Sequence, residues 1–131
     1  MHETIQPEGW APAVGYANGV AASGRTLFLG GQIGWNTQQL FESDDLVDQI
    51  RQTLENVVAV VETAGGEAAQ LVSMTWFMTD LEEYSARLGE IGGAYRDVIG
   101  KHFPAMAAIE VRRLVEARAK VEIQAIAVLS A

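Results

Sequence analysis

The clearest pattern in the chain is an alternation of apolar and polar residues near its C-terminal end. From Ala119 to Leu129 every second residue is apolar, and the residues between them begin polar and end apolar. Because successive residues of a strand face opposite sides of a sheet, this alternation predicts a β-strand with one buried face. Its second face turns apolar at Ile126 and Val128. We therefore expect that part of the second face to be covered by another layer of the chain or by a partner subunit.

Two segments carry a helical period instead. The first follows Ser43-Asp44-Asp45, whose short oxygen-bearing side chains suit a helix start, and it stops at Gly65-Gly66. Its apolar side is Ile50, Leu54, Val57, Val58 and Val61, and its polar side is Gln49, Arg51, Gln52, Glu55 and Glu62. The second helix is predicted from about Leu81 to Ile99, with an inward stripe of Tyr84, Leu88, Ile91 and Tyr95. Its glycines, which weaken a helix, are expected to permit close packing on a sheet: Gly89, Gly92 and Gly93.

Other stretches are typical of strands. Residues 16–21 and 26–30 are predicted to form a hairpin around Ser23-Gly24. Residues 71–79 form a third strand, whose Met and Trp face we interpret as core packing rather than a cofactor site. Pro104 to Val111 supplies the strand before the last one. Residues 1–13 are predicted to be an irregular lead-in, where Trp10 folds over the edge of the core or forms the wall of a pocket.

This order of elements predicts one α+β domain over residues 1–131. Both helices are expected to cover one face of a single mixed sheet, which leaves the other face open. The candidates to line the open face are Thr75, Phe77, Met106, Ala108, Ile126 and Val128. An exposed apolar sheet face predicts an oligomer.

Composition excludes several classes of function. The chain has 131 residues and no cysteine, so disulfides, thiol catalysis and thiolate metal sites are excluded. It has two histidines and no His/Asp/Glu cluster with metal-ligand spacing, so no metal site is expected. The net charge of −8 argues against a nucleic-acid partner. We see no long apolar run and no signal peptide, so no membrane partner is expected and the cytoplasm is the expected location.

Several single features allow two interpretations. Gly30-Gly31-Gln32-Ile33-Gly34 indicates a bulge, a close backbone approach or amides awaiting an anion, but its spacing is not that of a phosphate loop. His102 is interpreted as a surface residue at a helix end rather than a ligand contact. Glu110 and Glu122 are interpreted as ion-pair partners of Arg112, Arg113 or Lys120, with a role as catalytic base as the alternative.

Several separated motifs, in this order, resemble the RidA family (reactive intermediate deaminase A, also called YjgF-type or L-PSP-type). They are Tyr16 near the start, Gly31-Gln32-Ile33, the stretch from Gln49 to Asn56, Phe77-Met78-Thr79-Asp80, Pro104-Ala105 to Ile109-Glu110-Val111, and Val121 to Val128. The resemblance covers about Val14 to Leu129. It implies a chorismate-mutase-like fold, a homotrimer with small-molecule sites in clefts between subunits, and hydrolysis of enamines and imines such as 2-aminoacrylate without a cofactor.

The resemblance also indicates where the site lies and which two residues in it differ from the family pattern. Tyr16, Gly30, Gly31, Ala107 and Ala108 fall at or beside family site positions. The family arginine that grips the substrate carboxylate falls at Met106, and the family glutamate that handles water falls at Gln124. Methionine cannot pair with a carboxylate, and an amide cannot serve as a general base. We therefore expect Tyr16 and Gln124 to orient substrate or water, and we expect no activity on 2-aminoacrylate.

Three functions follow from this resemblance. The first is a divergent enamine or imine deaminase, in which the Gly31 amide polarises a carbonyl. The second is a non-catalytic trimer that binds a metabolite or a protein in the cleft between subunits. The third is ribonuclease activity, a label attached to this family, which is the weakest because the chain is acidic and offers no histidine pair.

Overall fold

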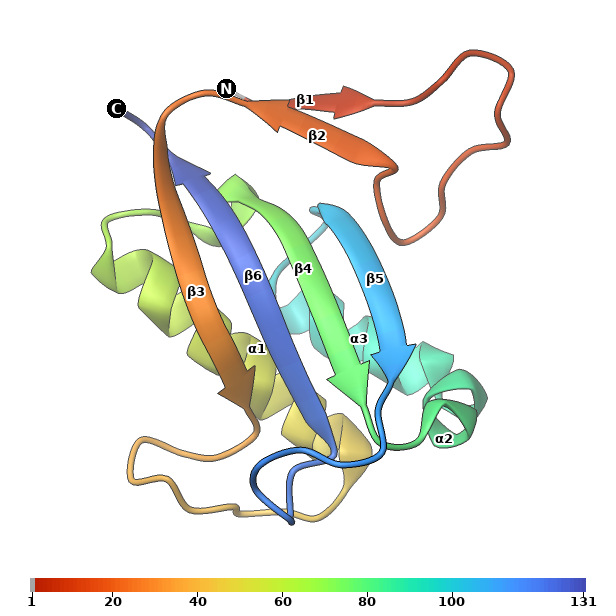
Figure 1. The fold of residues 1–131 in the computed structure, drawn as a ribbon, viewed down its shortest axis with the longest axis vertical. Coiled ribbons are helices and arrows are strands. Elements are labelled where there is room, and N and C mark those ends of the chain that lie inside the picture. The colour runs from red at the N-terminus through yellow and green to blue at the C-terminus, as the bar shows by residue number, and fades with distance from the viewer. Residues whose placement is uncertain (1) are drawn as a thin grey trace.

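The alternating C-terminal residues form β6 (Val121–Leu129), which lies inside a four-stranded sheet. In this computed structural model, which describes residues 2–131, β6 pairs antiparallel with both β3 (Arg25–Ile33) and β4 (Leu71–Met78). The edge strand β5 (Ala105–Glu110) runs parallel to β4 (Figure 1). The predicted mixed sheet is confirmed, and the strand with the clearest pattern is one of its two inner strands.

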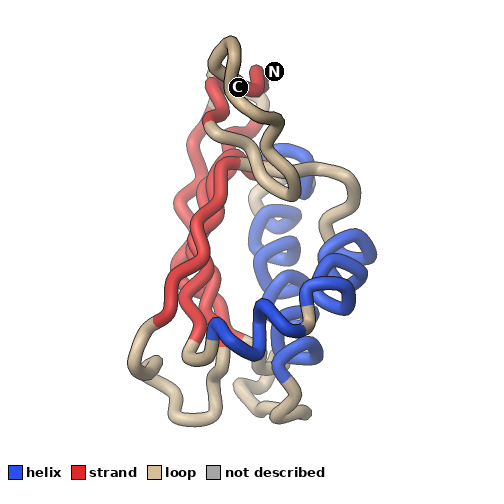
Figure 2. The backbone as a smooth tube through the Cα atoms, turned by 90° about the vertical axis from the view of Figure 1, so that its right-hand side faces the viewer, coloured by secondary structure: helices blue, strands red, loops and turns tan. Residues whose placement is uncertain are grey.

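The helices α1 (Leu46–Thr63), α2 (Leu81–Ala86) and α3 (Leu88–Val98) cover one face of this sheet, and in the described part of the chain the other face carries no helix (Figure 2). Helix α1 begins where expected, because the Asp45 carboxylate accepts from the N–H groups of Val47 and Asp48. A short 3₁₀ helix, Ala68–Gln70, leads into β4. The core lies between the two layers and includes Ile50, Leu54, Met74, Trp76 and Ile123.

The second predicted helix is broken at Arg87, so α2 and α3 are separate. Arg87 leaves the helical backbone region, and its guanidinium bonds Asp45 at 2.7 Å and Glu90 at 2.8 Å. The start of α2 also has a partner that we did not expect. Glu110 accepts from the Leu81 N–H at 3.0 Å and forms no ion pair within residues 2–131, so its predicted pairing with Arg112, Arg113 or Lys120 is wrong.

The N-terminal segment contains a second, two-stranded sheet. Here β1 (His2–Ile5) pairs antiparallel with β2 (Gly19–Ala22), so residues 1–13 are not wholly irregular and β2 does not form a hairpin with β3. This small sheet crosses the end of the main sheet where β6 stops, and His2 Nε2 donates to the Val128 carbonyl at 3.1 Å (Figure 1). Trp10, in the loop after β1, is 61% exposed and does not fold over the core.

The register of β5 corrects the predicted faces. Met106 pairs with Met74 and Ala108 with Trp76, so both lie on the helix-covered face rather than on the open one. Thr75, Phe77, Ile126 and Val128 lie on the open face as predicted, together with Phe28 and Ile109. The glycines of α3 do not serve close packing, because a Cβ at Gly89 or Gly93 would meet nothing within 4 Å.

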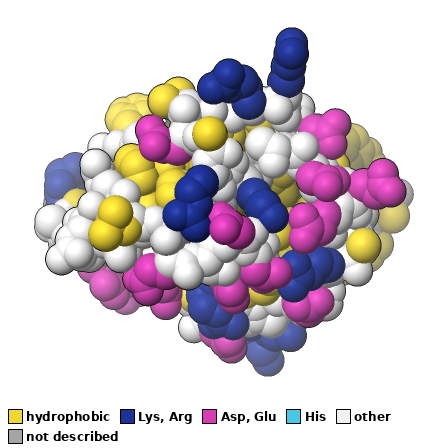
Figure 3. Space-filling model, turned by 90° about the horizontal axis from the view of Figure 1, so that it is seen from below, with side chains coloured by type: hydrophobic (Ala, Val, Ile, Leu, Met, Phe, Trp, Pro, Cys, Tyr) yellow, Lys and Arg dark blue, Asp and Glu magenta, His cyan; other side chains and the backbone are white. Residues whose placement is uncertain are grey.

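Acidic and basic side chains are interspersed at the end of the molecule where β5 connects to β6 (Figure 3). The connection carries Arg118, which pairs with Asp44 at 2.9 Å. Arg112, Arg113 and Lys120 lie in the same region, so this end of the molecule carries charges of both signs.

Candidate functional site

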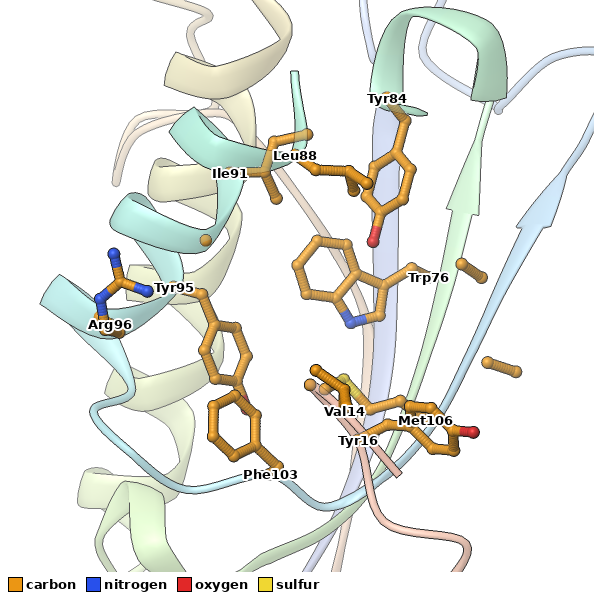
Figure 4. A pocket seen from close by; sticks show the side chains of 14 residues that line it. Val14, Tyr16, Trp76, Tyr84, Leu88, Ile91, Tyr95, Arg96, Phe103 and Met106 are labelled. Carbon is orange, nitrogen blue, oxygen red and sulfur yellow. The ribbon is translucent and has the colours of Figure 1, made fainter. Parts of the chain in front are cut away.

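A cavity of about 580 Å³ lies between helices α2 and α3, the edge strand β5 and the segment Val14–Tyr16 (Figure 4). It exists because β5 is an edge strand with small side chains at Ala107 and Ala108, while Gly92 on α3 adds no side chain opposite. The cavity is therefore open on one side and bounded by the helix layer on the other.

Four aromatic rings form a continuous wall of the cavity. Trp76 meets Tyr84 edge-on with centroids 6.3 Å apart, and it lies 6.4 Å from the ring of Tyr95. Tyr95 stacks on Phe103 at 5.6 Å with nearly parallel planes. Such contacts hold the rings in fixed orientations, so the wall is preorganised and apolar.

Hydrogen bonds fix the segment that joins α3 to β5. The Tyr95 hydroxyl donates to the His102 carbonyl at 2.6 Å, and His102 Nε2 donates to the Leu71 carbonyl at 2.7 Å. The Ala17 N–H then donates to the Pro104 carbonyl at 3.0 Å, which ties the N-terminal segment to the start of β5. His102 is therefore a half-buried structural residue and not the surface residue that we predicted.

Several polar groups around the cavity can donate a hydrogen bond to a ligand, although the Tyr95 hydroxyl already donates to the His102 carbonyl. Burial raises the pKa of the Tyr84 phenol and that of the Tyr95 phenol, so both hydroxyls remain protonated at neutral pH. The buried Trp76 Nε1–H has no hydrogen-bond partner within the described residues. Arg96 contributes the positive charge, and none of the lining residues among 2–131 is Asp or Glu. The cavity thus suits a ligand with an apolar body and acceptor atoms.

The structure brings together four of the seven predicted site residues. Tyr16, Met106, Ala107 and Ala108 all line the cavity, and Tyr16 is 43% exposed. Gly30, Gly31 and Gln124 do not line it. Gln124 is exposed on the helix-free face, where it pairs with Thr75. The Glu122 carboxylate lies directly against the Gly31 backbone, so a side chain at Gly31 would collide with it.

Sequence reasoning missed the aromatic wall as part of a site. Trp76, Tyr84 and Tyr95 were assigned to the core because residues that line a cavity beneath a helix show the same period as residues that fill it. Leu88, expected to be buried, is 54% exposed at the cavity. Arg96 follows Tyr95 in α3 and carried no signal that distinguishes it from other surface arginines.

The described part of the chain contains neither a metal-binding cluster nor a membrane-spanning helix. Within residues 2–131, no three His, Asp or Glu side chains gather closely enough to hold a metal ion. None of the helices described for those residues has the length and apolar character needed to cross a membrane.

Comparison with known proteins identifies the family. The model of the family described as Endoribonuclease L-PSP matches residues 8–129. The 2-iminobutanoate/2-iminopropanoate deaminase of Salmonella typhimurium is 36% identical over 132 aligned positions, which cover 98% of each chain. The putative reactive intermediate deaminase TdcF of Escherichia coli is also 36% identical, over the whole of both chains.

Solved structures show the same fold. The Rid family protein YyfB from Yersinia pestis superposes with a TM-score of 0.87 at 30% identity, covering 98% of both chains. Escherichia coli TdcF, solved with bound serine, superposes with a TM-score of 0.71 at 34% identity, covering 98% of this chain and 99% of that one. The chain therefore belongs to the endoribonuclease L-PSP family, the RidA family that its sequence resembles.

Proposed function

We propose that this chain is a homotrimeric, cofactor-independent hydrolase of the imine and enamine deaminase type, with its sites in the clefts between subunits. The relatives named as deaminases, one of them a 2-iminobutanoate/2-iminopropanoate deaminase, support the reaction class. The main support for the proposal is that the candidate residues lie on two separate surfaces of one chain. Tyr16 and Met106 line the cavity on the helix side, whereas Gly31 and Gln124 lie across the sheet from it.

A second copy of the chain can bring these two groups of residues together. The open sheet face carries apolar residues such as Phe28 and Ile126, so it is suited to face another subunit. Such packing brings the edge that holds Gly31, Glu122 and Gln124 of one subunit to the cavity of its neighbour. The site is then complete only in the oligomer.

The chemistry needs a water molecule and a proton acceptor. Water adds to the carbon of the C=N bond, the C–N bond then breaks, and a carbonyl compound and ammonia leave. Gln124 can hold the water through its amide but cannot take a proton. Glu122 has its carboxylate against the Gly31 backbone and shares a face of β6 with Gln124, and it serves as the general base. The Gly31 amide polarises the carbonyl that forms, and Tyr16 orients the substrate.

The expected substrate is not 2-aminoacrylate. Met106 stands where the resemblance places the arginine that grips a small carboxylate, and a thioether offers no charge-assisted hydrogen bond. The substrate carboxylate must therefore be absent or be held by another group.

The decay of 2-aminoacrylate, generated by a serine dehydratase, tests the proposal. We expect no acceleration by the wild-type protein and some acceleration by the double variant Met106→Arg/Gln124→Glu. Acceleration by the wild type would show that the arginine and glutamate are dispensable. If neither protein accelerates the decay and the wild type hydrolyses no larger imine, a second candidate function is favoured. That function is a non-catalytic trimer that binds a metabolite or a protein. The uncharged Met106 and Gln124 are what favour that candidate.

A further inference from the structure

The cavity holds a buried hydrogen-bond donor that lacks an acceptor. Trp76 is 4% exposed, and its Nε1–H has no partner in the described chain. Buried donors without partners are rare in folded proteins because such a group loses its bond to water and gains none in return. In Figure 4 this nitrogen is directed toward the end of the cavity where Val14, Tyr16 and Met106 lie. Met106 is unbranched and flexible, so it can move aside for a ligand atom that accepts this hydrogen bond.

The cavity also holds a cation without a counter-ion. Arg96 lines it and forms no ion pair with any residue from 2 to 131. Gly92 lies one helical turn earlier, and a Cβ added there would come within 3.8 Å of the Arg96 Nη1. The missing side chain at Gly92 keeps the space beside the guanidinium free. A carboxylate is the group whose geometry matches the two donors of a guanidinium fork.

The remaining surface of the cavity is apolar and large. Tyr84, Tyr95 and Phe103 present ring faces and edges to a volume of about 580 Å³. A three-carbon acid would leave most of this volume unfilled, whereas a ligand with an aromatic ring would bury its ring against these side chains.

We propose that the cavity selects 2-imino acids with an aromatic side chain, together with the 2-oxo acids that they give on hydrolysis. Arg96 binds the carboxylate, the Trp76 N–H donates to the imine nitrogen or the carbonyl oxygen, and the ring packs against the aromatic wall. This inference rests on the proposed function and names its substrate class. Hydrolysis adds the water oxygen to C2 and releases ammonia, so the 2-oxo acid keeps the carboxylate and an acceptor in the same places.

Phenylpyruvate is a suitable probe because it is a stable 2-oxo acid of this class. Calorimetric titration of the wild-type protein should give binding at least about tenfold tighter than that of pyruvate. Arg96→Gln should weaken phenylpyruvate binding by about tenfold or more, since it removes a charge-assisted pair. Lys101→Gln, which removes a positive charge just after the same helix but outside the cavity, should bind like the wild type. Trp76→Phe keeps a ring and loses the donor, and should weaken binding by about fivefold.

A second variant separates lost binding from lost folding. Gly92→Leu places a side chain in the cavity and improves the helix propensity of α3, so it should fold and yet not bind phenylpyruvate. Equal binding by the wild type and Arg96→Gln, undiminished binding by Gly92→Leu, or no preference over pyruvate would overturn the assignment.

The titration needs no turnover, so its failure is distinct from that of the proposed function. A protein that shows the expected binding pattern but hydrolyses no imine refutes the enzyme and leaves the ligand class in place. An active imine hydrolase whose binding ignores Arg96 and Gly92 refutes the ligand class alone.

Discussion

Gln49 is buried, although the sequence pattern places it on the polar side of a helix. It was assigned to the polar side of α1, yet it is 1% exposed. Its Nε2 donates to the carbonyls of Ser43 and Arg118 at 3.1 and 3.0 Å, and its Oε1 accepts from the Lys120 N–H at 2.9 Å. One buried amide thus joins the start of α1 to the connection before β6.

Gln49→Met keeps the length of the side chain but leaves three backbone groups unpaired. We expect the free energy of unfolding to fall by about 2–4 kcal/mol, because each unpaired buried group costs roughly 1–3 kcal/mol and the effects are not additive. Urea denaturation at pH 7 measures the loss. The matched control is Gln52→Met in the same helix. Among the described residues the Gln52 amide bonds only Asn56, so this change should cost under about 1 kcal/mol. Equal losses in the two variants would contradict this role for Gln49.

Arg87, at the junction of α2 and α3, makes part of the folding stability depend on pH. Its hydrogen bond to Asp45 holds the pKa of that carboxyl below its usual range, and its hydrogen bond to Glu90 lowers the pKa of that carboxyl as well. Carboxyls with lowered pKa values bind fewer protons in the folded state than in the unfolded state. Their contribution to stability is therefore complete above the unfolded pKa of about 4, and it disappears as the pH falls through the lowered folded value.

We expect the stability difference between the wild type and Arg87→Met to be largest near pH 7 and to shrink below about pH 4. Urea denaturation at pH 7, 5 and 3 measures it. Arg25→Met is the control, because Arg25 donates to the Ala64 carbonyl and pairs with no carboxylate of residues 2–131. Its effect should be similar at all three pH values. An Arg87→Met difference that stays constant down to pH 3 would show that these carboxyls gain nothing from the arginine.

At the level of elements, α3 carries glycines that its own packing does not require. A Cβ at Gly89 or Gly93 meets no atom within 4 Å, and neither residue has a positive φ. Gly89→Ala and Gly93→Ala should each raise the free energy of unfolding by about 0.5–1 kcal/mol through helix propensity. Differential scanning calorimetry would detect the gain. In contrast, Gly65→Ala should lower stability, because Gly65 has a φ of 90° at the end of α1. A loss of stability in Gly93→Ala would indicate that a neighbouring subunit packs on α3.

The elements differ in how much of them the sequence predicts. Helix α1 and strand β6 were predicted well, because one buried face imposes a period that is visible within a single segment. The pairing of β1 with β2 was not, since it depends on residues distant in the chain. The break falls at Arg87, whose guanidinium pairs with Asp45, a residue distant in the chain, and the period of one segment does not reveal such a contact. The face of Met106 was assigned wrongly because β5 is mostly small and apolar on both parities, so it shows no alternation.

The candidate site was predicted only in part, for a related physical cause. Tyr16, Met106, Ala107 and Ala108 were placed by motif, and the fold brings them to one cavity. The aromatic wall was assigned to the core, because an apolar period does not show whether the space above it is filled.

At the level of the whole molecule, the sheet face without helices remains apolar. Phe28 is 74% exposed and Ile109 is 41% exposed, and Ile126 lies on β6 between their strands. A surface of this kind is costly in water unless another subunit covers it. The proposed trimer buries it and, in the same step, completes the divided site.

Light scattering tests this assembly directly. The wild-type protein should have a mass of about 42 kDa, three times the 14.1 kDa of one chain. Ile126→Asp places a charge in the middle of the open face, where burial without a partner is costly, so it should shift the mass toward that of a monomer. Val115→Asp is the control, because Val115 is 90% exposed in the connection between β5 and β6 and should leave the trimer intact. A wild-type monomer, or an Ile126→Asp trimer, would mean that the open face is not the interface. Packing of subunits through the open face would then not bring Gly31 and Gln124 to the cavity of a neighbour.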